Sequence, residues 1–208
     1  MEKIDIPRKA VYRLSLYLRC LEKLQEKKEE TVSSEALAKA AGVKSTQLRK
    51  DLGYIGQFGT RGLGYNVDIL AKAITGVMGS TRLQPVVLVG VGTLGAAMLQ
   101  YSGFKREGFE IIAAFDQSND VIAQRTDASP VPIYHSDQMV DYIRSHDVKM
   151  TILAVPGNYG QQVANALVEA GVEAILNFSP VVLQVPDHVV VNHVDLAAEL
   201  ESLSYFVK

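Results

Sequence analysis

The chain has 208 residues, which is long enough for one large or two small domains, each with a buried core. Its hydrophobic content of 48% is ordinary for a soluble globular protein. Its apolar runs are too short to cross a bilayer, its first five residues are too charged for a signal peptide, and its single cysteine, Cys20, excludes an internal disulfide; we expect a cytoplasmic protein. The net charge of −2 divides unevenly: residues 1–80 carry 14 Lys and Arg against 9 Asp and Glu, whereas the remainder carries 7 against 14, which favours a polyanionic partner for the front half.

The first predicted element is a long amphipathic helix. Pro7 can open it, and the charged run at 26–30 ends it as an exposed loop. Apolar residues recur at helical spacing to about Gln25, namely Ala10, Val11, Leu14, Tyr17, Leu18, Leu21 and Leu24.

Two short helices follow. Ser33 and Ser34 are expected to cap the first, which Gly42 closes; Ser45 is expected to cap the second, over residues 46–52, which Gly53 ends. Two helices joined by a short glycine-containing turn are typical of the helix-turn-helix that places its second helix in the major groove of DNA.

The second of these helices has two faces. Leu48 and Leu52 are expected in the core, whereas the remaining polar side chains suit base edges and phosphates. The glycine-rich stretch 59–64 predicts a hairpin with Arg61 near its tip, which is a wing. We expect DNA contacts from Ser45, Thr46, Gln47, Arg49, Lys50, Tyr54, Thr60 and Arg61; an ordinary interaction module with a solvated helix face is the alternative.

A further helix over residues 66–78 and a linker over 79–85 close the front half, predicting a winged-helix DNA-binding domain over residues 1–80. After the linker, residues 86–89 form an unbroken apolar run, typical of a strand buried on both faces of a parallel sheet.

A G-x-G-x-x-G motif follows that strand directly. Gly90 would make the tight turn, Gly92 would let the backbone approach a pyrophosphate, and Gly95 would let a helix over residues 95–101 pack closely. Asp116 ends the next strand, residues 110–115, at the distance expected of a ribose-binding acid. Because no Lys or Arg lies beside Asp116, the motif favours NAD(H) over NADP(H).

Strands and helices then alternate. After a loose polar segment at 117–130 we expect strands over 131–134, 150–155, 174–176 and 189–191, with helices over 136–145 and 158–170. This is a Rossmann-like, doubly wound parallel sheet of an α/β protein, whose ligands lie at the carboxyl ends of the strands. The expected cofactor-binding residues are Gly90, Val91, Gly92, Thr93, Leu94, Gly95, Tyr101, Asp116, Val155, Pro156, Asn177, Ser179, Pro180 and Phe206.

The last predicted helix begins after Asp195 as its cap. It carries more apolar surface than a solvent-facing tail should, at Leu196, Leu200, Leu203, Tyr205, Phe206 and Val207. We therefore expect it to pack on something outside its own sheet, such as a second subunit.

Residues for catalysis are not evident. The four histidines, His135, His146, His188 and His193, lack metal-ligand spacing, so no metal is expected. Tyr101 and Lys105 match a Tyr-x-x-x-Lys pair, but Gly103 interrupts the segment. A non-enzymatic protein is favoured; an NAD-dependent reductase with a helical N-terminal extension, and a CoA- or nucleotide-binding interaction module, are the alternatives.

Seven blocks in order, across both halves, carry a family resemblance: residues 17–19, 32–34, 48–52, 59–65, 90–95, 171–180 and 193–195. On these blocks the chain resembles Rex, the redox-sensing transcriptional repressors of bacteria.

The resemblance implies a homodimer in which the C-terminal helix, residues 194–208, is domain-swapped, and an NAD(H)-binding domain over residues 81–193. It implies that two winged helices bind a palindromic double-stranded operator while NADH is low, and that NADH releases them. Arg19, Tyr101 and Asp195 match the residues that link the DNA-binding domain, the nicotinamide region and the swapped helix. The cofactors implied are NADH and NAD+.

A mechanism follows as a hypothesis. Oxidation changes the nicotinamide from a neutral ring to a cation, and a pocket end lined by Val155, Phe178, Pro180 and Phe206 would penalise burying that cation. NADH would then favour a closed dimer whose wings are misplaced for DNA.

Overall fold

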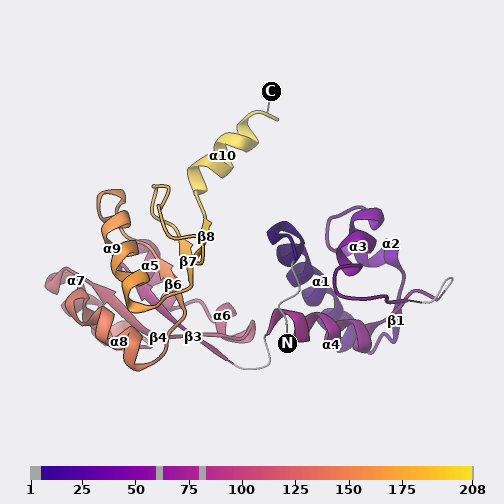
Figure 1. Ribbon diagram of the computed structural model, residues 1–208, viewed down its shortest axis with the longest axis horizontal. Helices are drawn as coiled ribbons and strands as arrows, with labels where there is room; N and C mark the ends of the chain where they lie inside the picture. Colours follow the sequence, from indigo (N-terminus) through magenta and orange to yellow (C-terminus); the bar gives the residue numbers. More distant parts are fainter. Residues whose placement is uncertain (1–5, 60–62, 80–82, 208) are drawn as a thin grey trace. The chain divides into compact units, whose positions relative to one another are not determined.

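The computed structural model describes residues 6–59, 63–79 and 83–207, and the chain divides into two compact units, 1–82 and 83–208 (Figure 1). Each unit buries apolar side chains of its own.

The described residues of the first unit form four helices and a two-stranded ribbon. Its elements are α1 (Arg8–Glu26), β1 (Thr31–Val32), α2 (Ser34–Ala40), α3 (Ser45–Leu52), β2 (Tyr65–Asn66) and α4 (Val67–Met78). The apolar face predicted for the first helix is buried at Leu14, Tyr17 and Leu21, against Leu48 of α3 and Ile74 of α4. β1 and β2 pair antiparallel.

Side-chain caps set the helix starts in this unit. The hydroxyl of Ser33 accepts the backbone N–H of Ala36, and the amide oxygen of Asn66 accepts that of Ile69. The prediction that Ser45 caps α3 is wrong: Lys44 is the N-cap, with no side-chain hydrogen bond, and Ser45 is the first helical residue. Residues 60–62, the middle of the hairpin predicted over 59–64, lie outside the described residues, and with them the DNA contacts expected of Thr60 and Arg61.

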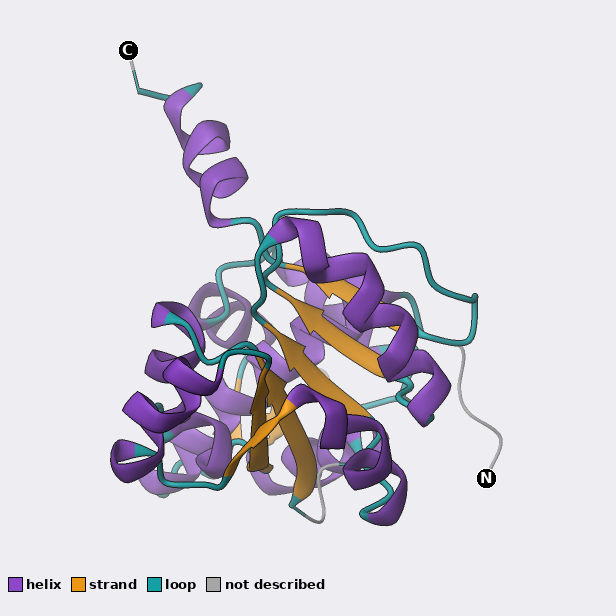
Figure 2. Cartoon of the chain, turned by 90° about the vertical axis from the view of Figure 1, so that its left-hand side faces the viewer, coloured by secondary structure: helices purple, strands orange, loops and turns teal. Residues whose placement is uncertain are grey.

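The second unit is a six-stranded parallel sheet between helices (Figures 1 and 2). Its elements are β3 (Gln84–Val89), α5 (Thr93–Leu99), α6 (Gly103–Arg106), β4 (Phe109–Asp116), α7 (Asn119–Arg125), the 3-10 turn η1 (Thr126–Ala128), β5 (Ile133–His135), the 3-10 turn η2 (Ser136–Gln138), α8 (Met139–Ser145), β6 (Met150–Leu153), α9 (Gly157–Ala170), β7 (Ala174–Asn177), β8 (Val190–His193) and α10 (Leu196–Ser204).

The strand order is β5-β4-β3-β6-β7-β8, so the chain winds outward from β3 in both directions. Alternate residues of β3 feed two cores: Val87 and Val89 pack with residues of α8 and α9, whereas Val86 and Leu88 pack with residues of α5 and α7. This is the doubly wound arrangement predicted from the sequence, and its switch point lies between β3 and β6.

The largest differences from the predicted elements in this unit concern two helices. α5 begins at Thr93 rather than Gly95, because Gly92 is its N-cap. The segment expected to be loose contains α7, whose start is capped by the hydroxyl of Ser118. Only Val121 and Ile122 of α7 pack on the core, so the polar sequence concealed the helix.

α10 packs on nothing in its own unit. The carboxylate of Asp195 accepts the backbone N–H groups of Ala197 and Ala198, both at 3.0 Å, which confirms the predicted cap. No residue of α10 is buried, and Figure 1 shows it extending away from the sheet of its unit. Of the helices in the described ranges, none is long and apolar enough to span a membrane.

Candidate functional site

A cavity of about 620 Å³ opens at the carboxyl ends of β3, β4 and β6. This is the crevice where doubly wound sheets bind ligands. Seven of the predicted cofactor-binding residues line it: Gly90, Gly92, Thr93, Leu94, Asp116, Val155 and Pro156. The other seven, Val91, Gly95, Tyr101, Asn177, Ser179, Pro180 and Phe206, are not in its lining.

The glycine motif shapes one wall of the cavity. Gly90 has φ +96°, and a Cβ there would strike the carbonyl oxygen of Ala154. A Cβ on Gly95 would strike the carbonyl oxygen of Gly90, so α5 crosses the turn at a distance only glycine allows. At Gly92, in contrast, an added Cβ would meet no protein atom within 4 Å, so this position faces open space in the cavity.

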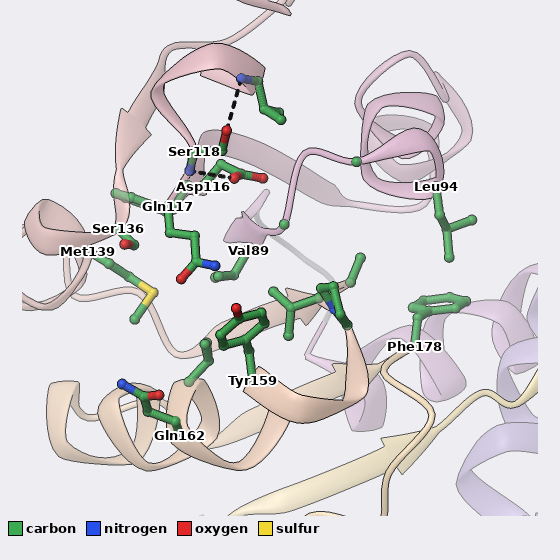
Figure 3. A pocket seen from close by; sticks show the side chains of 18 of the residues that line it. Val89, Leu94, Asp116, Gln117, Ser118, Ser136, Met139, Tyr159, Gln162 and Phe178 are labelled. Carbon is green, nitrogen blue, oxygen red and sulfur yellow. Dashed lines mark hydrogen bonds between the residues drawn. The ribbon is translucent and has the colours of Figure 1, made fainter.

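Asp116 connects the glycine loop to the residues that follow β4 through two hydrogen bonds. Its Oδ2 accepts the backbone N–H of Val91 at 2.8 Å. Its Oδ1 accepts the backbone N–H of Ser118 at 2.9 Å (Figure 3). A carboxylate has about four lone-pair sites, so both oxygens can accept further hydrogen bonds from a ligand. The sequence predicted the acid but not its second task, which is to hold the glycine loop against the end of β4.

The cavity has a polar end and an apolar end (Figure 3). Asp116, Gln117, Ser118 and Ser136 surround the first, whereas the side chains of Leu94 and Phe178 face each other at the second. A long ligand with one polar and one apolar end fits this arrangement.

Tyr159 and Gln162 reach into the cavity from α9, and sequence reasoning missed both (Figure 3). A signal was available, because Pro156 and Gly157 mark the point where α9 begins, shortly after the end of β6. Side chains in the first turns of such a helix lie beside the carboxyl end of the sheet.

Asn177 is buried and organises the loop that carries Phe178. Its amide nitrogen donates to the carbonyl oxygens of Ser179 and Val181 and lies 2.9 Å from Nδ1 of His193; its oxygen accepts the N–H of Ser179. The hydroxyl of Ser179 is buried without a partner among the described atoms.

Tyr101 and Lys105, the pair considered for enzymatic chemistry, each contact a different residue. Tyr101 is exposed and makes an edge contact with Phe104, while Lys105, on α6, pairs with Glu110 at 2.9 Å. Within residues 6–59, 63–79 and 83–207, no three His, Cys, Asp or Glu side chains gather as they would around a metal ion.

On α3, the side chains expected to read DNA are mostly on the surface. Thr46, Arg49 and Lys50 are exposed, and the guanidinium of Arg49 donates to the hydroxyl of Ser34 on α2 at 3.0 Å. Ser45, Gln47 and Tyr54 are half-buried.

A buried carboxylate lies behind this surface. Asp51 is fully buried on α3 and bonds to Arg13 and Tyr17 of α1. Burial alone would raise the pKa of Asp51, but the hydrogen bonds from Arg13, Tyr17 and Gln47 outweigh burial and hold it below the ordinary value. Burial and the bond to Asp51 in turn raise the pKa of Tyr17.

The stability supplied by Asp51 is expected to disappear in acid. Because its pKa in the folded protein is lowered from 3.8, the charged form stabilises the fold above that value, and the contribution is lost as the pH falls through the lowered pKa. Replacing Asp51 with asparagine is expected to cost roughly 3 kcal/mol between pH 5 and pH 8. Urea unfolding of both proteins should show this difference shrinking from pH 4 to pH 2; a difference that stays constant contradicts the assignment.

Comparisons with known proteins cover both units. A family model described as "Putative DNA-binding protein N-terminus" matches residues 5–53, and one described as "CoA binding domain" matches residues 81–181. Among curated proteins, the redox-sensing transcriptional repressor Rex of Streptomyces avermitilis is 46% identical over 200 residues, covering 96% of this chain and 79% of the relative. That of Pelotomaculum thermopropionicum is 42% identical over 205 residues, covering 99% and 95%.

Solved structures match along nearly the whole chain as well. RSP in complex with β-NAD+ and operator DNA is 32% identical, with a TM-score of 0.89 and coverage of 98% of this chain and 93% of that one. RSP in complex with β-NADH is 30% identical, with a TM-score of 0.84 and coverage of 97% and 94%.

Proposed function

The chain belongs to the Rex family of redox-sensing transcriptional repressors, and we propose that it binds operator DNA through its first unit and releases that DNA when NADH binds its second unit. The observation that carries this proposal is the match, over 98% of the chain, to a structure that holds both β-NAD+ and operator DNA. The relatives are named as repressors, not as enzymes, so the reductase alternative is set aside.

The cavity fits a dinucleotide along its length. The pyrophosphate would lie at Gly92, where the backbone is open to a close approach and α5 begins. A hydroxyl group of the adenosine ribose would donate a hydrogen bond to the carboxylate of Asp116 at the polar end. Val91 and Gly95 are buried, so they support this wall from behind rather than line it.

The choice of NAD(H) over NADP(H) rests on the charges around the polar end. Asp116 and Asp137 line the cavity, and the described lining contains no Lys or Arg. A phosphate on the adenosine ribose would meet carboxylates without a cation to balance it. We therefore infer that NADP(H) binds much more weakly.

The nicotinamide would lie at the apolar end, near Leu94, Val155 and Phe178. Burying the cationic ring of NAD+ there costs more than burying the neutral ring of NADH. A preference of about 100-fold for NADH corresponds to about 2.7 kcal/mol, which is sufficient to shift a two-state equilibrium in response to a cellular ratio. Asn177, Ser179 and Pro180 would shape this end by fixing the loop on which Phe178 lies.

We infer a homodimer that binds a palindromic operator, with α10 of each chain covered by the partner. The exposed apolar residues of α10 support this inference, because such a surface is rarely left in water. Phe206 and Tyr101, which are exposed in the single chain, are proposed to complete the nicotinamide end in the dimer. The cytoplasm, which holds both DNA and NADH, is the proposed location.

The link between cofactor and DNA is proposed to run through Arg19 on α1, Tyr101 on the turn after α5, and Asp195 at the start of α10. Each lies at an element that the mechanism requires to move: the first unit, the cofactor unit and the dimer helix. A change of dimer geometry on NADH binding would thereby reach the wings.

A mobility-shift experiment with a random genomic library, run with and without NADH, tests this function. Selected fragments should share a palindrome and should be released by NADH. Binding of no fragment would favour the nucleotide-binding interaction module, and oxidation of NADH with an added substrate, followed by its absorbance, would favour a reductase.

Replacing Arg49 with alanine should weaken operator binding about tenfold, because an exposed arginine on the DNA-reading helix would lose a base or phosphate contact. The affinity for NADH should not change, since Arg49 lies in the first unit. Fluorescence anisotropy of labelled operator measures the first quantity, and calorimetry measures the second. Arg106→Ala, which removes an exposed charge from the second unit, is the matched control; equal operator affinity in Arg49→Ala and wild type would contradict the DNA surface.

A further inference from the structure

Asp51 makes four hydrogen bonds from a fully buried position, and none of its partners was evident from the sequence. The guanidinium of Arg13 donates two hydrogen bonds to the carboxylate of Asp51: Nε lies 2.6 Å from Oδ2 and Nη2 lies 2.7 Å from Oδ1. The hydroxyl of Tyr17 donates to Oδ2 at 2.8 Å, and Nε2 of Gln47 donates to Oδ1 at 2.8 Å. The side chain of Asp51 is 0% exposed and that of Arg13 is 22% exposed.

Stability alone does not explain why polar rather than apolar side chains occupy these buried positions. Removing an ion pair from water costs about as much as the attraction returns, and apolar side chains of similar volume often stabilise a core equally well. α1 and α3 already pack through Leu14, Leu48 and Leu52. The network instead fixes an orientation. A bidentate arginine–carboxylate contact has one favourable geometry, so it fixes the rotation of α3 relative to α1.

The network also reaches the DNA-reading surface. Gln47 lies on the first turn of α3, between exposed Thr46 and buried Leu48, and Asp51 holds one of its amide N–H groups. Its oxygen and its second N–H have no partner among the described residues and can bind an external one. An amide that offers one acceptor and one donor side by side matches N6 and N7 of adenine in the major groove.

We propose that Asp51 is a positioning residue for operator recognition, fixing α3 on α1 through Arg13 and Tyr17 and turning the amide of Gln47 toward an adenine edge. This inference rests on the proposed DNA-binding function and deepens it. It names adenine as one base that the protein recognises and Asp51 as the side chain that orients Gln47 toward it.

The test separates positioning from folding. In the triple variant Arg13→Met, Tyr17→Phe, Asp51→Leu, apolar groups replace Asp51 and its two partners on α1, so no buried charge is left alone. Full-length protein without NADH is titrated with labelled operator and with a random-sequence duplex of equal length, and thermal unfolding is recorded. Asp68→Asn is the matched control, because Asp68 accepts a bond from Gln25 at 2.7 Å in the same unit but at its surface.

We expect the triple variant to lose at least tenfold in operator affinity while its affinity for random DNA and its melting temperature stay near those of the wild type. Asp68→Asn should change none of the three. An unchanged ratio of operator to random affinity overturns the proposal. Equal losses on both DNAs together with a lower melting temperature also overturn it, because the network would then serve only the fold.

Gln47→Leu provides a second readout that leaves the ion pair in place. Operators with each adenine of the half-site replaced in turn should show that this variant no longer discriminates at one position. The triple variant should lose discrimination at that same position; loss at a different one, or at none, contradicts the role assigned to Asp51. A wild-type protein that prefers no sequence would instead refute the proposed function.

Discussion

Replacing Gly92 with alanine is expected to make operator binding insensitive to NADH without weakening the fold. Gly92 has φ −63°, which any residue adopts, and an added Cβ meets no protein atom within 4 Å. The methyl group would instead occupy the space where we place the pyrophosphate, directly before α5. NADH affinity should fall at least 100-fold, while operator affinity measured without cofactor stays at the wild-type value.

Two other glycines make this experiment specific. Gly76→Ala, in α4, adds the same methyl group where no atom outside its own helix lies within 4 Å, and Gly76 is far along the chain from the cavity, so it should leave NADH binding intact. Gly95→Ala should lose both NADH binding and stability, since its Cβ would strike the carbonyl oxygen of Gly90. Wild-type NADH affinity in Gly92→Ala would show that the dinucleotide does not lie along the glycine loop.

Replacing Leu200 and Leu203 with aspartate is expected to dissociate the proposed dimer into monomers. Most of the operator affinity should be lost as a result. Both side chains are more than half exposed in the single chain, at 69% and 60%, so the charges should not disturb the fold of one subunit. Two linked DNA-binding units gain affinity because the second contact is made within the complex, and losing that gain should weaken operator binding about 100-fold.

Sedimentation and anisotropy titration measure mass and affinity in the same samples. Glu201→Gln, on the same helix, is the matched control and should remain dimeric with wild-type affinity. A double variant that keeps the mass of the wild type would contradict the assignment of α10 to the subunit interface. A monomer that keeps full operator affinity would contradict the need for two units.

The sheet and the glycine loop could be predicted from sequence because the forces that make them are local. Residues 86–89 are apolar without interruption, and this run is compatible only with burial on both faces. The glycine spacing then specifies a turn and a close helix crossing that other residues cannot make. Caps at Ser33 and Asp195 were likewise readable, because each acts within three residues of its partner.

The remaining features depend on contacts between distant residues. Asp51 lies among polar residues, where a carboxylate is ordinarily solvated, and its partner Arg13 is 38 residues away. Asp116 was recognised as a ligand-binding acid, but its bond to Val91 arises only when β4 lies beside β3. α7 was missed because none of its residues is fully buried and only Val121 and Ile122 pack partly on the core, so its periodic pattern is too weak to detect.

The central claim is that the redox state of a dinucleotide in the second unit determines whether the first unit holds DNA. It is tested most directly by titrating operator occupancy against the NADH/NAD+ ratio at constant total dinucleotide and constant salt. We predict that occupancy falls in a single transition as NADH replaces NAD+, and that Gly92→Ala abolishes the transition. A flat curve for the wild-type protein, with both cofactors shown to bind, would contradict the account.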